Sequence, residues 1–409
     1  EDGYLPGPIV SKTYFLYENF SVPVVSLSTN SEYFWDNEIG LYVEGTNGIP
    51  GNCSSKPKNW NQDWERAINF EYFTSDGTPE LSQVVGTKIV GGCSRIRDQK
   101  SLGFFARNKY GKRRLNYKFF QDKDLDSVKN VVLRISGNDY KSSRLRDAFM
   151  QNIVKQRMDI DYQEHQPAVA FINGSYWGHY NIREKINEHY IAANHDVDPD
   201  EIDFMEYNNK VTLLQGSRAH YDSLINFINL EDISDSINYN YVKRQMDIDE
   251  FINYYIAEIY FDNQDFPQNN VKFWRPQTPE GKWRWILLDT DWGFGLDYAS
   301  EDYNALQWAM YGSSEFTGWP WSTNLFNRLF DNEDFKNEFI QRFASHLNTT
   351  FKYDRVVHIL DSMKNLINDE ITRHIDKWAT PGSYSNWNWQ VTVTMPAFAY
   401  DRVSEVTQD

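Results

Sequence analysis

Between residues 21 and 182, apolar positions come in short runs that glycine, asparagine and aspartate interrupt, a pattern typical of β-strands. Asn173-Gly174 is a strong hairpin signal, and it predicts one strand over residues 168–172 and a second over residues 176–182. The remaining strands that the pattern predicts cover residues 21–30, 84–96, 100–106 and 131–135.

From residue 183 onward the apolar positions recur mainly at helical spacing, and we expect a first helix from about Arg183. Inside the strand-rich part, one helix is expected to begin near Ser142, because a serine can cap it and Leu145 and Phe149 lie on one face. The other expected helices cover residues 217–229, 241–260, 332–347 and 353–378.

This succession predicts an α+β protein with a β-rich N-terminal lobe over residues 21–182 and a mainly helical C-terminal lobe over residues 183–409. Residues 1–20 are expected to be the leading segment of a preceding module. The helix expected to end near residue 260 leads directly into the most polar stretch of the second lobe.

That stretch, residues 262–295, holds the residues that can carry chemistry. Asp265 stands five residues before Asn270, while Asp289 and Asp291 follow an apolar strand and precede a Gly-Phe-Gly turn. Phosphoryl transfer needs a carboxylate that accepts the proton of the attacking hydroxyl, and a carboxylate with an amide oxygen that hold magnesium on the phosphates. Protein kinases space these groups in the same way, so the stretch predicts an atypical kinase.

Each of these roles has a rival nearby. Asp262 is the alternative to Asp265 as the base, and Asn269 is the alternative to Asn270 as a metal ligand. Asp289 and Asp291 are two residues apart on a segment expected to be extended, so both carboxylates share one face and either can be the main ligand.

Composition narrows the functional classes. The chain has 409 residues, 40% of them hydrophobic, and a formal net charge of −17, which argues against nucleic acid as the main partner. No apolar run approaches the roughly 18 residues of a membrane-spanning helix, so no membrane span is expected. An acidic protein that binds ATP must concentrate positive charge locally. The candidate phosphate lysine is Lys100 at the start of an expected strand, with Lys88 and Arg95 as competitors.

Several motifs in order resemble the CotH kinase family, named for a spore coat protein. Two of them are N-G-S-Y-W-G-H-Y-N-I-R-E-K-I-N-E at residues 173–188 and L-L-D-T-D-W-G-F-G at residues 287–295. Three others, P-V-V-S-L-S-T-N, S-R-I-R-D-Q-K-S-L and R-D-A-F-M-Q, are similar to the branch found in bacterial secreted and cell-surface proteins.

The resemblance implies an atypical protein-kinase-like fold and an ATP- and magnesium-dependent enzyme that phosphorylates proteins. It places Lys100 where the family has a lysine, and it marks Glu184, which is expected to bind the nucleotide or, more simply, to support the junction of the lobes. The helix near Ser142 carries no glutamate to pair with Lys100, so Asp147 is the candidate substitute, and a local pair with Arg144 one turn earlier is the alternative.

Two further pairs of residues are of interest. Trp283 and Trp285 lie two apart on a strand; core packing is their expected use, and stacking on adenine is the functional alternative. Cys53 and Cys93 are either a disulfide, as suits a protein outside the cytoplasm, or two free thiols.

The sequence therefore predicts an atypical protein kinase that transfers the γ-phosphate of ATP to a protein hydroxyl and depends on Mg²⁺. The alternative ions are Mn²⁺ and Ca²⁺. Its partner is an unidentified protein substrate, and it is expected to be extracellular or on the cell surface, within a longer multidomain protein. The alternative is a catalytically weak kinase-fold scaffold or binding module. A carbohydrate-binding protein is a third hypothesis, resting on the aromatic content of 16% alone.

Overall fold

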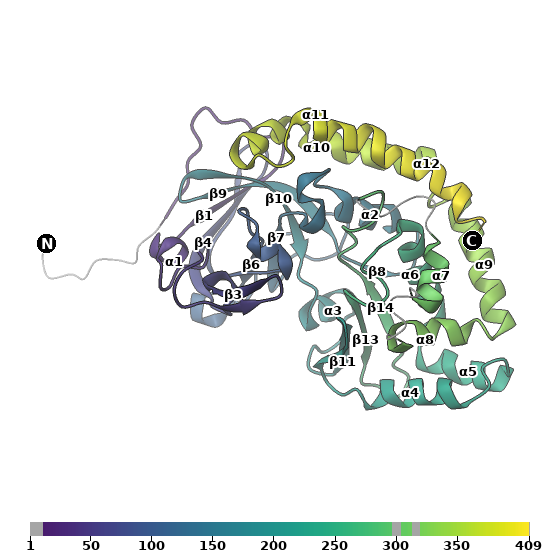
Figure 1. The fold of residues 1–409 in the computed structure, drawn as a ribbon. Helices are drawn as coiled ribbons and strands as arrows, with labels where there is room; N and C mark the ends of the chain where they lie inside the picture. Colours follow the sequence, from purple (N-terminus) through teal and green to yellow (C-terminus); the bar gives the residue numbers. More distant parts are fainter. Residues whose placement is uncertain (1–10, 297–303, 313–319, 409) are drawn as a thin grey trace, which may run out of the picture. The chain divides into compact units, whose positions relative to one another are not determined.

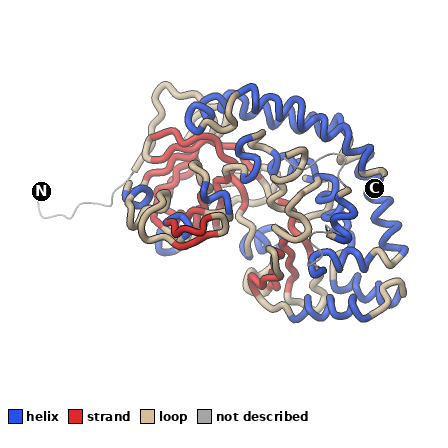
Figure 2. Tube along the Cα trace, viewed as in Figure 1, coloured by secondary structure: helices blue, strands red, loops and turns tan. Residues whose placement is uncertain are grey.

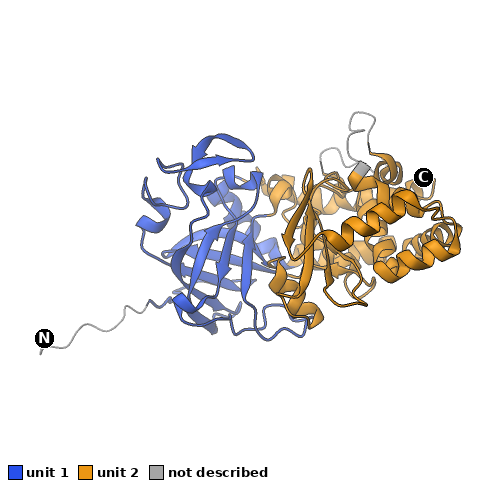
Figure 3. Cartoon of the chain, turned by 90° about the horizontal axis from the view of Figure 1, so that it is seen from below, with its two compact units in different colours: residues 1–135, 166–183, 366–379 blue, residues 136–165, 184–365, 380–409 orange. Residues whose placement is uncertain are grey.

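The structure is a computed structural model that describes residues 11–296, 304–312 and 320–408 and divides the chain into two compact units. The first unit contains residues up to Ile135 together with Gln166–Arg183 and Leu366–Ala379; the remainder forms the second unit (Figure 3). The boundary expected after residue 182 is one residue away from the point where the chain passes from the first unit to the second, between Arg183 and Glu184. In contrast, residues 136–165 belong to the second unit, because their helix binds that unit's acidic segment.

Strands of the first unit close into a barrel (Figure 1). The pairs β1–β4, β4–β5, β5–β6 and β6–β7 are antiparallel, whereas β1 and β9 run parallel and close the barrel. In barrel order the strands are β1 (Val24–Ser28), β4 (Arg66–Phe73), β5 (Pro79–Ile89), β6 (Leu102–Phe105), β7 (Asn130–Arg134), β10 (Ser175–Glu184) and β9 (His165–Ile172).

Alternation along the strands fills the barrel interior. On β5, Leu81 and Val85 are buried in the core while Ser82 and Val84 are exposed, as the two-residue period of a strand requires. The predicted hairpin is confirmed: β9 ends and β10 begins on either side of Asn173-Gly174, and both turn residues have positive φ, at 48° and 80°.

The two cysteines of the chain are joined. Cys53 and Cys93 form a disulfide with a Cα–Cα distance of 5.0 Å, so of the two alternatives left by the sequence the structure has the bonded pair. The bridge ties the loop after β2 to η2. The short elements of this region are α1 (Glu32–Trp35), β2 (Ile49–Gly51), β3 (Ser54–Lys58), η1 (Asn59–Asn61), η2 (Cys93–Ile96) and η3 (Asn108–Tyr110).

The second unit is richer in helix (Figure 2), yet it is built on a sheet of which the sequence pattern predicted only the strand before Asp289. Its strands lie in the order β12 (Val211–Gln215), β11 (Ile202–Tyr207), β13 (Val271–Pro276), β14 (Arg284–Leu287) and β8 (Asp161–Tyr162). Only the contact between β14 and β8 is parallel among these described strands. Most of the sheet was missed because two of its strands are very short and its central strands carry Lys, Arg and Asp.

Helices make up most of the rest. The expected helices over residues 217–229, 332–347 and 353–378 are confirmed to within two residues at their ends. The helices and single turns are η4 (Gly137–Lys141), α2 (Arg146–Val154), α3 (Glu188–His195), α4 (Ala219–Leu230), α5 (Ser236–Gln245), α6 (Ile248–Phe261), α7 (Ala305–Tyr311), α8 (Pro320–Leu329), α9 (Glu333–Asn348), α10 (Tyr353–Trp378), α11 (Tyr384–Trp389), η5 (Gln390–Thr394) and α12 (Met395–Glu405). The last part of α10, from Leu366 onward, belongs to the first unit together with Ala379.

Three helix predictions differ from the structure. The helix expected to begin near Ser142 begins only at Arg146, and no serine side chain caps it. The other two predictions are wrong because of a polar cap. No helix starts at Arg183, because β10 continues to Glu184 and α3 begins only where the Asn187 side chain accepts bonds from His189 N and Tyr190 N. The helix expected over residues 241–260 is two helices, because the Asp247 side chain accepts a bond from Glu250 N and starts α6 anew.

Among the described residues, no helix combines the length and the apolar character needed to cross a membrane.

Candidate active site

The acid–amide loop begins where α6 ends. Asp262 closes the helix in the left-handed region, with φ 51°, and the chain then turns back through residues 263–270. Each oxygen of the Asp265 carboxylate accepts a side-chain amide: Oδ1 from Asn269 and Oδ2 from Asn270, both at 3.0 Å. The acid and the amide that the sequence singled out are therefore in direct contact, and the rival Asn269 shares the same carboxylate.

The second acidic segment follows β14, but it is not extended as expected. Asp289 has φ 54°, a left-handed conformation that aspartate tolerates better than most residues, so the expectation that its carboxylate shares a strand face with that of Asp291 is wrong. Asp291 is 1% exposed and its Oδ1 accepts the backbone N–H of Asn138 at 3.2 Å. Asp289 is half-buried.

The two segments lie side by side and are joined through their backbones. Gln264 N donates to Trp292 O at 3.0 Å, and Phe294 N donates to Phe261 O at 2.8 Å. Gly293 makes this approach possible, because a Cβ at that position would stand 2.6 Å from Phe261 O. Gly293 is thus required by the packing between the two segments, and Asp265 and Asp291 come from segments that lie next to each other.

Helix α2 holds the acidic segment along one of its faces. Gln151 Nε2 donates to Leu287 O at 3.1 Å, and Asp147 Oδ1 accepts both the N–H and the hydroxyl of Thr290 at 3.1 Å. Arg146 Nε donates to Phe294 O at 3.2 Å. Asp147 thus holds Thr290, the residue between Asp289 and Asp291, in position. The motif R-D-A-F-M-Q contributes all three side chains.

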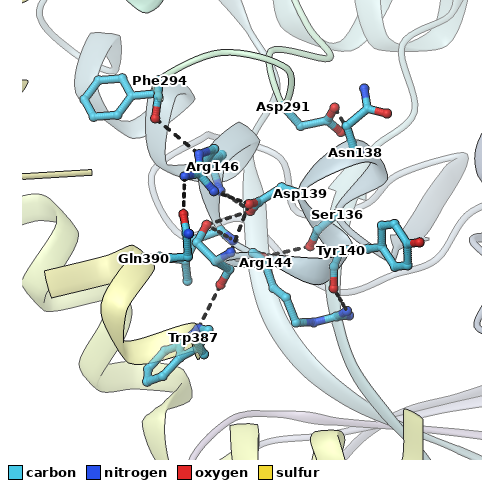
Figure 4. A network of polar contacts seen from close by, with 12 residues as sticks. Ser136, Asn138, Asp139, Tyr140, Arg144, Arg146, Asp291, Phe294, Trp387 and Gln390 are labelled. Atoms are coloured by element: carbon cyan, nitrogen blue, oxygen red, sulfur yellow. Dashed lines mark hydrogen bonds and ion pairs between the residues drawn. The ribbon is translucent and has the colours of Figure 1, made fainter. Parts of the chain in front are cut away.

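Arg146 is itself held by a buried polar network (Figure 4). Its guanidinium, fully buried, forms an ion pair with the fully buried Asp139 and donates to Gln390 Oε1 at 2.7 Å. Asp139 also accepts the N–H and hydroxyl of Ser143 at 3.0 and 2.6 Å. A buried ion pair is tolerated only when both partners are so engaged, and removing one partner typically costs about 3–5 kcal/mol.

The C-terminal helices complete the frame. Arg402, fully buried on α12, donates to Ile259 O at 2.7 Å and Tyr260 O at 3.2 Å, which satisfies carbonyl groups at the end of α6. On the same helix, the Phe398 ring packs against Phe294 with centroids 4.5 Å apart. The start of the acid–amide loop and the end of the acidic turn are therefore both fastened to residues 395–405.

Glu258 was not singled out from the sequence, yet it lies next to these groups. It is 2% exposed, one helical turn before the end of α6, and its Oε2 accepts Asn263 Nδ2 at 2.9 Å. Burial, together with the nearby Asp265 and Asp147 carboxylates, raises the pKa of Glu258 to about 8 although the bond from Asn263 opposes the shift. A charged residue in the otherwise apolar run I-A-E-I-Y-F was the signal available in the sequence.

Other predicted site residues have structural partners. Glu184 is 4% exposed; its Oε2 accepts Glu164 N at 2.8 Å and its Oε1 accepts Asn194 Nδ2 at 3.1 Å. It connects β10 to the segment before β9 and to α3, as expected for a supporting residue.

Trp283 and Trp285 are in the core of the second unit, at 0% and 2% exposure. The Trp285 ring stacks on Phe273 with centroids 5.6 Å apart, and Trp283 Nε1 contacts His220 Nδ1 at 3.0 Å. In this conformation both rings are covered by protein, in agreement with core packing, the use that the sequence analysis favoured over stacking on adenine.

Lys100 belongs to the first unit, whereas the acidic segments belong to the second. Its ammonium donates to Arg95 O at 2.8 Å and Arg97 O at 2.6 Å and lies 4.0 Å from the centre of the Trp60 ring. The residue is 3% exposed, and burial lowers the pKa of Lys100 to about 8.

The two competitors of Lys100 have partners as well. Lys88 donates to Asp63 at 2.6 Å, and Arg95 donates to Gly91 O and to Trp60 O, at 2.5 and 3.3 Å.

The residues of the acidic segments suit magnesium in their donor chemistry. Mg²⁺ prefers oxygen ligands and usually takes one or two carboxylates, with water and substrate phosphates filling the other positions. Asp289 and Asp291 supply carboxylates. Asn270 uses its Nδ2 in the bond to Asp265, so its side-chain oxygen Oδ1 can serve as a further metal ligand. Within the described part of the chain, no group of three or more His, Cys, Asp or Glu is placed to hold a metal.

The sheet and helices around these paired acidic segments define a kinase-like α+β protein. A family profile described as CotH kinase protein matches residues 87–403, which is most of the chain. The chain belongs to the CotH kinase family, as its motifs indicated. A comparison with curated proteins finds no match.

We expect Lys100→Met to destabilise the first unit. The substitution removes a charged donor from two partly buried carbonyl groups, which should lower the free energy of unfolding by roughly 2–4 kcal/mol. Thermal unfolding measures the effect, with Lys56→Met, an exposed lysine, as the control. An unchanged melting temperature combined with lost ATP binding would assign Lys100 to phosphate instead of to the barrel.

We expect the stability of the protein to fall with rising pH through Glu258. Its folded pKa, about 8, lies above the ordinary 4.5, so its stabilising contribution is complete below about pH 4.5 and is lost as pH rises through about 8. Glu258→Gln, which is neutral at every pH, should melt increasingly above the natural protein between about pH 5 and pH 9. Glu333→Gln, an exposed glutamate, is the control; a constant difference for Glu258→Gln would contradict the raised pKa.

Proposed function

We propose that the chain is a protein kinase that transfers the γ-phosphate of ATP to a hydroxyl group of a protein, with magnesium. The observation that carries the proposal is the backbone pairing of the two acidic segments, which brings the Asp265–Asn270 pair next to the turn holding Asp289 and Asp291. These are the parts that phosphoryl transfer requires.

Each residue has a distinct task in this proposal. Asp265 orients the acceptor hydroxyl and takes its proton as the oxygen attacks the γ-phosphorus and ADP leaves; the amides of Asn269 and Asn270 aim its two oxygens. Asp289, Asp291 and the Asn270 oxygen would hold magnesium. When bound, the ion supplies positive charge that offsets the charge of the β- and γ-phosphates.

The disulfide between Cys53 and Cys93 supports a site of action outside the cytoplasm, because such bonds persist in oxidising compartments. We propose that the protein is secreted or displayed on a cell surface and that its substrate there is another protein.

The contacts of Lys100 favour a second candidate, a kinase-fold binding module with weak or no catalysis. Two of the three N–H donors of Lys100 are bound to Arg95 O and Arg97 O, and the residue is 3% exposed. For Lys100 to bind phosphate its side chain must become accessible, or the phosphates must be held by other cations. Such a module would bind its partner without transferring phosphate.

Purified protein with magnesium and γ-labelled ATP should label itself or an added protein acceptor. Asp265→Asn and Asp291→Asn should each lower the rate at least about a hundredfold, since general acid–base groups and charge-stabilising ligands contribute factors of this size. Asp354→Asn, an exposed acid on α10, is the matched control and should keep the natural rate.

ATP with magnesium should also raise the melting temperature, since a ligand present at about a hundredfold its dissociation constant adds about 2.7 kcal/mol to the free energy of unfolding. Natural rates in both acid variants would exclude the proposed roles. A melting shift without labelling would favour the binding module.

A further inference from the structure

Helix α6 is almost entirely apolar on its buried faces, yet it buries two glutamates. Glu250 and Glu258 are 0% and 2% exposed. Burying a carboxyl group costs free energy unless its hydrogen bonds are made, so each must have a structural partner or a function. Glu250 accepts the backbone N–H of Trp285 at 3.0 Å and thereby joins α6 to β14. Glu258 faces the acid–amide loop.

The contact of Glu258 is passed along the chain by one residue, Asn263. Glu258 Oε2 accepts Asn263 Nδ2 at 2.9 Å, and Asn263 Oδ1 in turn accepts the backbone N–H of Asp265 at 3.2 Å. Asn263 is also bound at its backbone: its N donates to Glu258 O at 3.3 Å and its O accepts Phe266 N at 3.1 Å. The Glu258 side chain therefore helps to fix, through Asn263, the backbone position of Asp265, the proposed base.

The carboxylate of Asp265 has no freedom to compensate for a moved backbone. Its two oxygens are bound by Asn269 and Asn270, and Asn269 N donates to Asp265 O at 2.9 Å, so residues 265–270 behave as one closed turn. Shifting the start of this turn would shift both the base and the amide that is proposed to bind the metal.

Charge is consistent with this arrangement. The raised pKa of Glu258 keeps its carboxyl largely protonated near neutral pH, so it adds little repulsion to Asp265 and Asp147. A neutral group can hold Asn263 without competing for the metal or for the proton that Asp265 receives.

We propose that Glu258 is a positioning residue for phosphoryl transfer, which acts through Asn263 to fix the turn that presents Asp265 and Asn270. The role rests on the proposed function, but the ordering of the turn can be measured without catalysis. Glu258 does not touch substrate; its removal should loosen the turn and misplace the base, while a neutral isostere should preserve both.

The test compares Glu258→Ala, Asn263→Ala and Glu258→Gln by hydrogen exchange and by phosphate transfer. Exchange in peptides covering residues 262–270 should be about tenfold faster or more in the first two variants, since each loses a buried hydrogen bond, and unchanged in Glu258→Gln. The turnover number should fall by roughly tenfold to a hundredfold in the alanine variants with little change in the KM for ATP, and Glu258→Gln should stay near the natural value.

Glu250→Ala is the matched control, because it removes the other buried glutamate of the same helix. It should lower the melting temperature without loosening residues 262–270. Unchanged exchange in both Glu258→Ala and Asn263→Ala would overturn the proposal, and so would a loss in Glu258→Gln equal to that in Glu258→Ala, since that result would require a charged carboxylate. If the natural protein transfers no phosphate, the proposed function fails, while the exchange data still decide the role of Glu258 in ordering the turn.

Discussion

Two backbone hydrogen bonds connect the parts of the candidate site: Gln264 N to Trp292 O and Phe294 N to Phe261 O. They join the loop after α6 to the turn after β14, and without them Asp265 and Asp291 would belong to separate surfaces. The contact is possible only because Gly293 has no side chain, since a Cβ would stand 2.6 Å from Phe261 O. Much of the buried polar structure of the second unit serves to hold this junction in place.

That support comes from three directions, and all of it is buried. Helix α2 holds the acidic turn through Arg146, Asp147 and Gln151; α12 holds the end of α6 through Arg402; and Glu258 holds the loop from within α6. Buried polar groups cost free energy unless every hydrogen bond is made, so such a frame gains little stability over apolar packing. What it provides is a fixed geometry, which is what catalysis by positioned charges requires.

Local signals in the sequence predicted part of the fold. The α+β class, the Asn173-Gly174 hairpin and the long α10 followed from local signals, and the contact between Asp265 and Asn270 agrees with their spacing. Most of the sheet of the second unit was missed because its strands are short or carry charged residues and because its pairing joins distant segments, which no local pattern encodes. For the same reason the sequence assigned no role to Arg146 and Gln151, although both belong to the motif R-D-A-F-M-Q. Their partners, Phe294 and Leu287, lie more than a hundred residues away in the sequence.

We propose that the two joined segments hold one magnesium-nucleotide site. This proposal is tested most directly by crystals grown with Mn²⁺ and a non-hydrolysable ATP analogue, in which anomalous scattering locates the ion. We predict that manganese is bound by Asp289 or Asp291 together with the Asn270 side-chain oxygen, and that the γ-phosphate faces Asp265. Manganese and nucleotide ordered elsewhere on the protein, with these side chains unengaged, would contradict it.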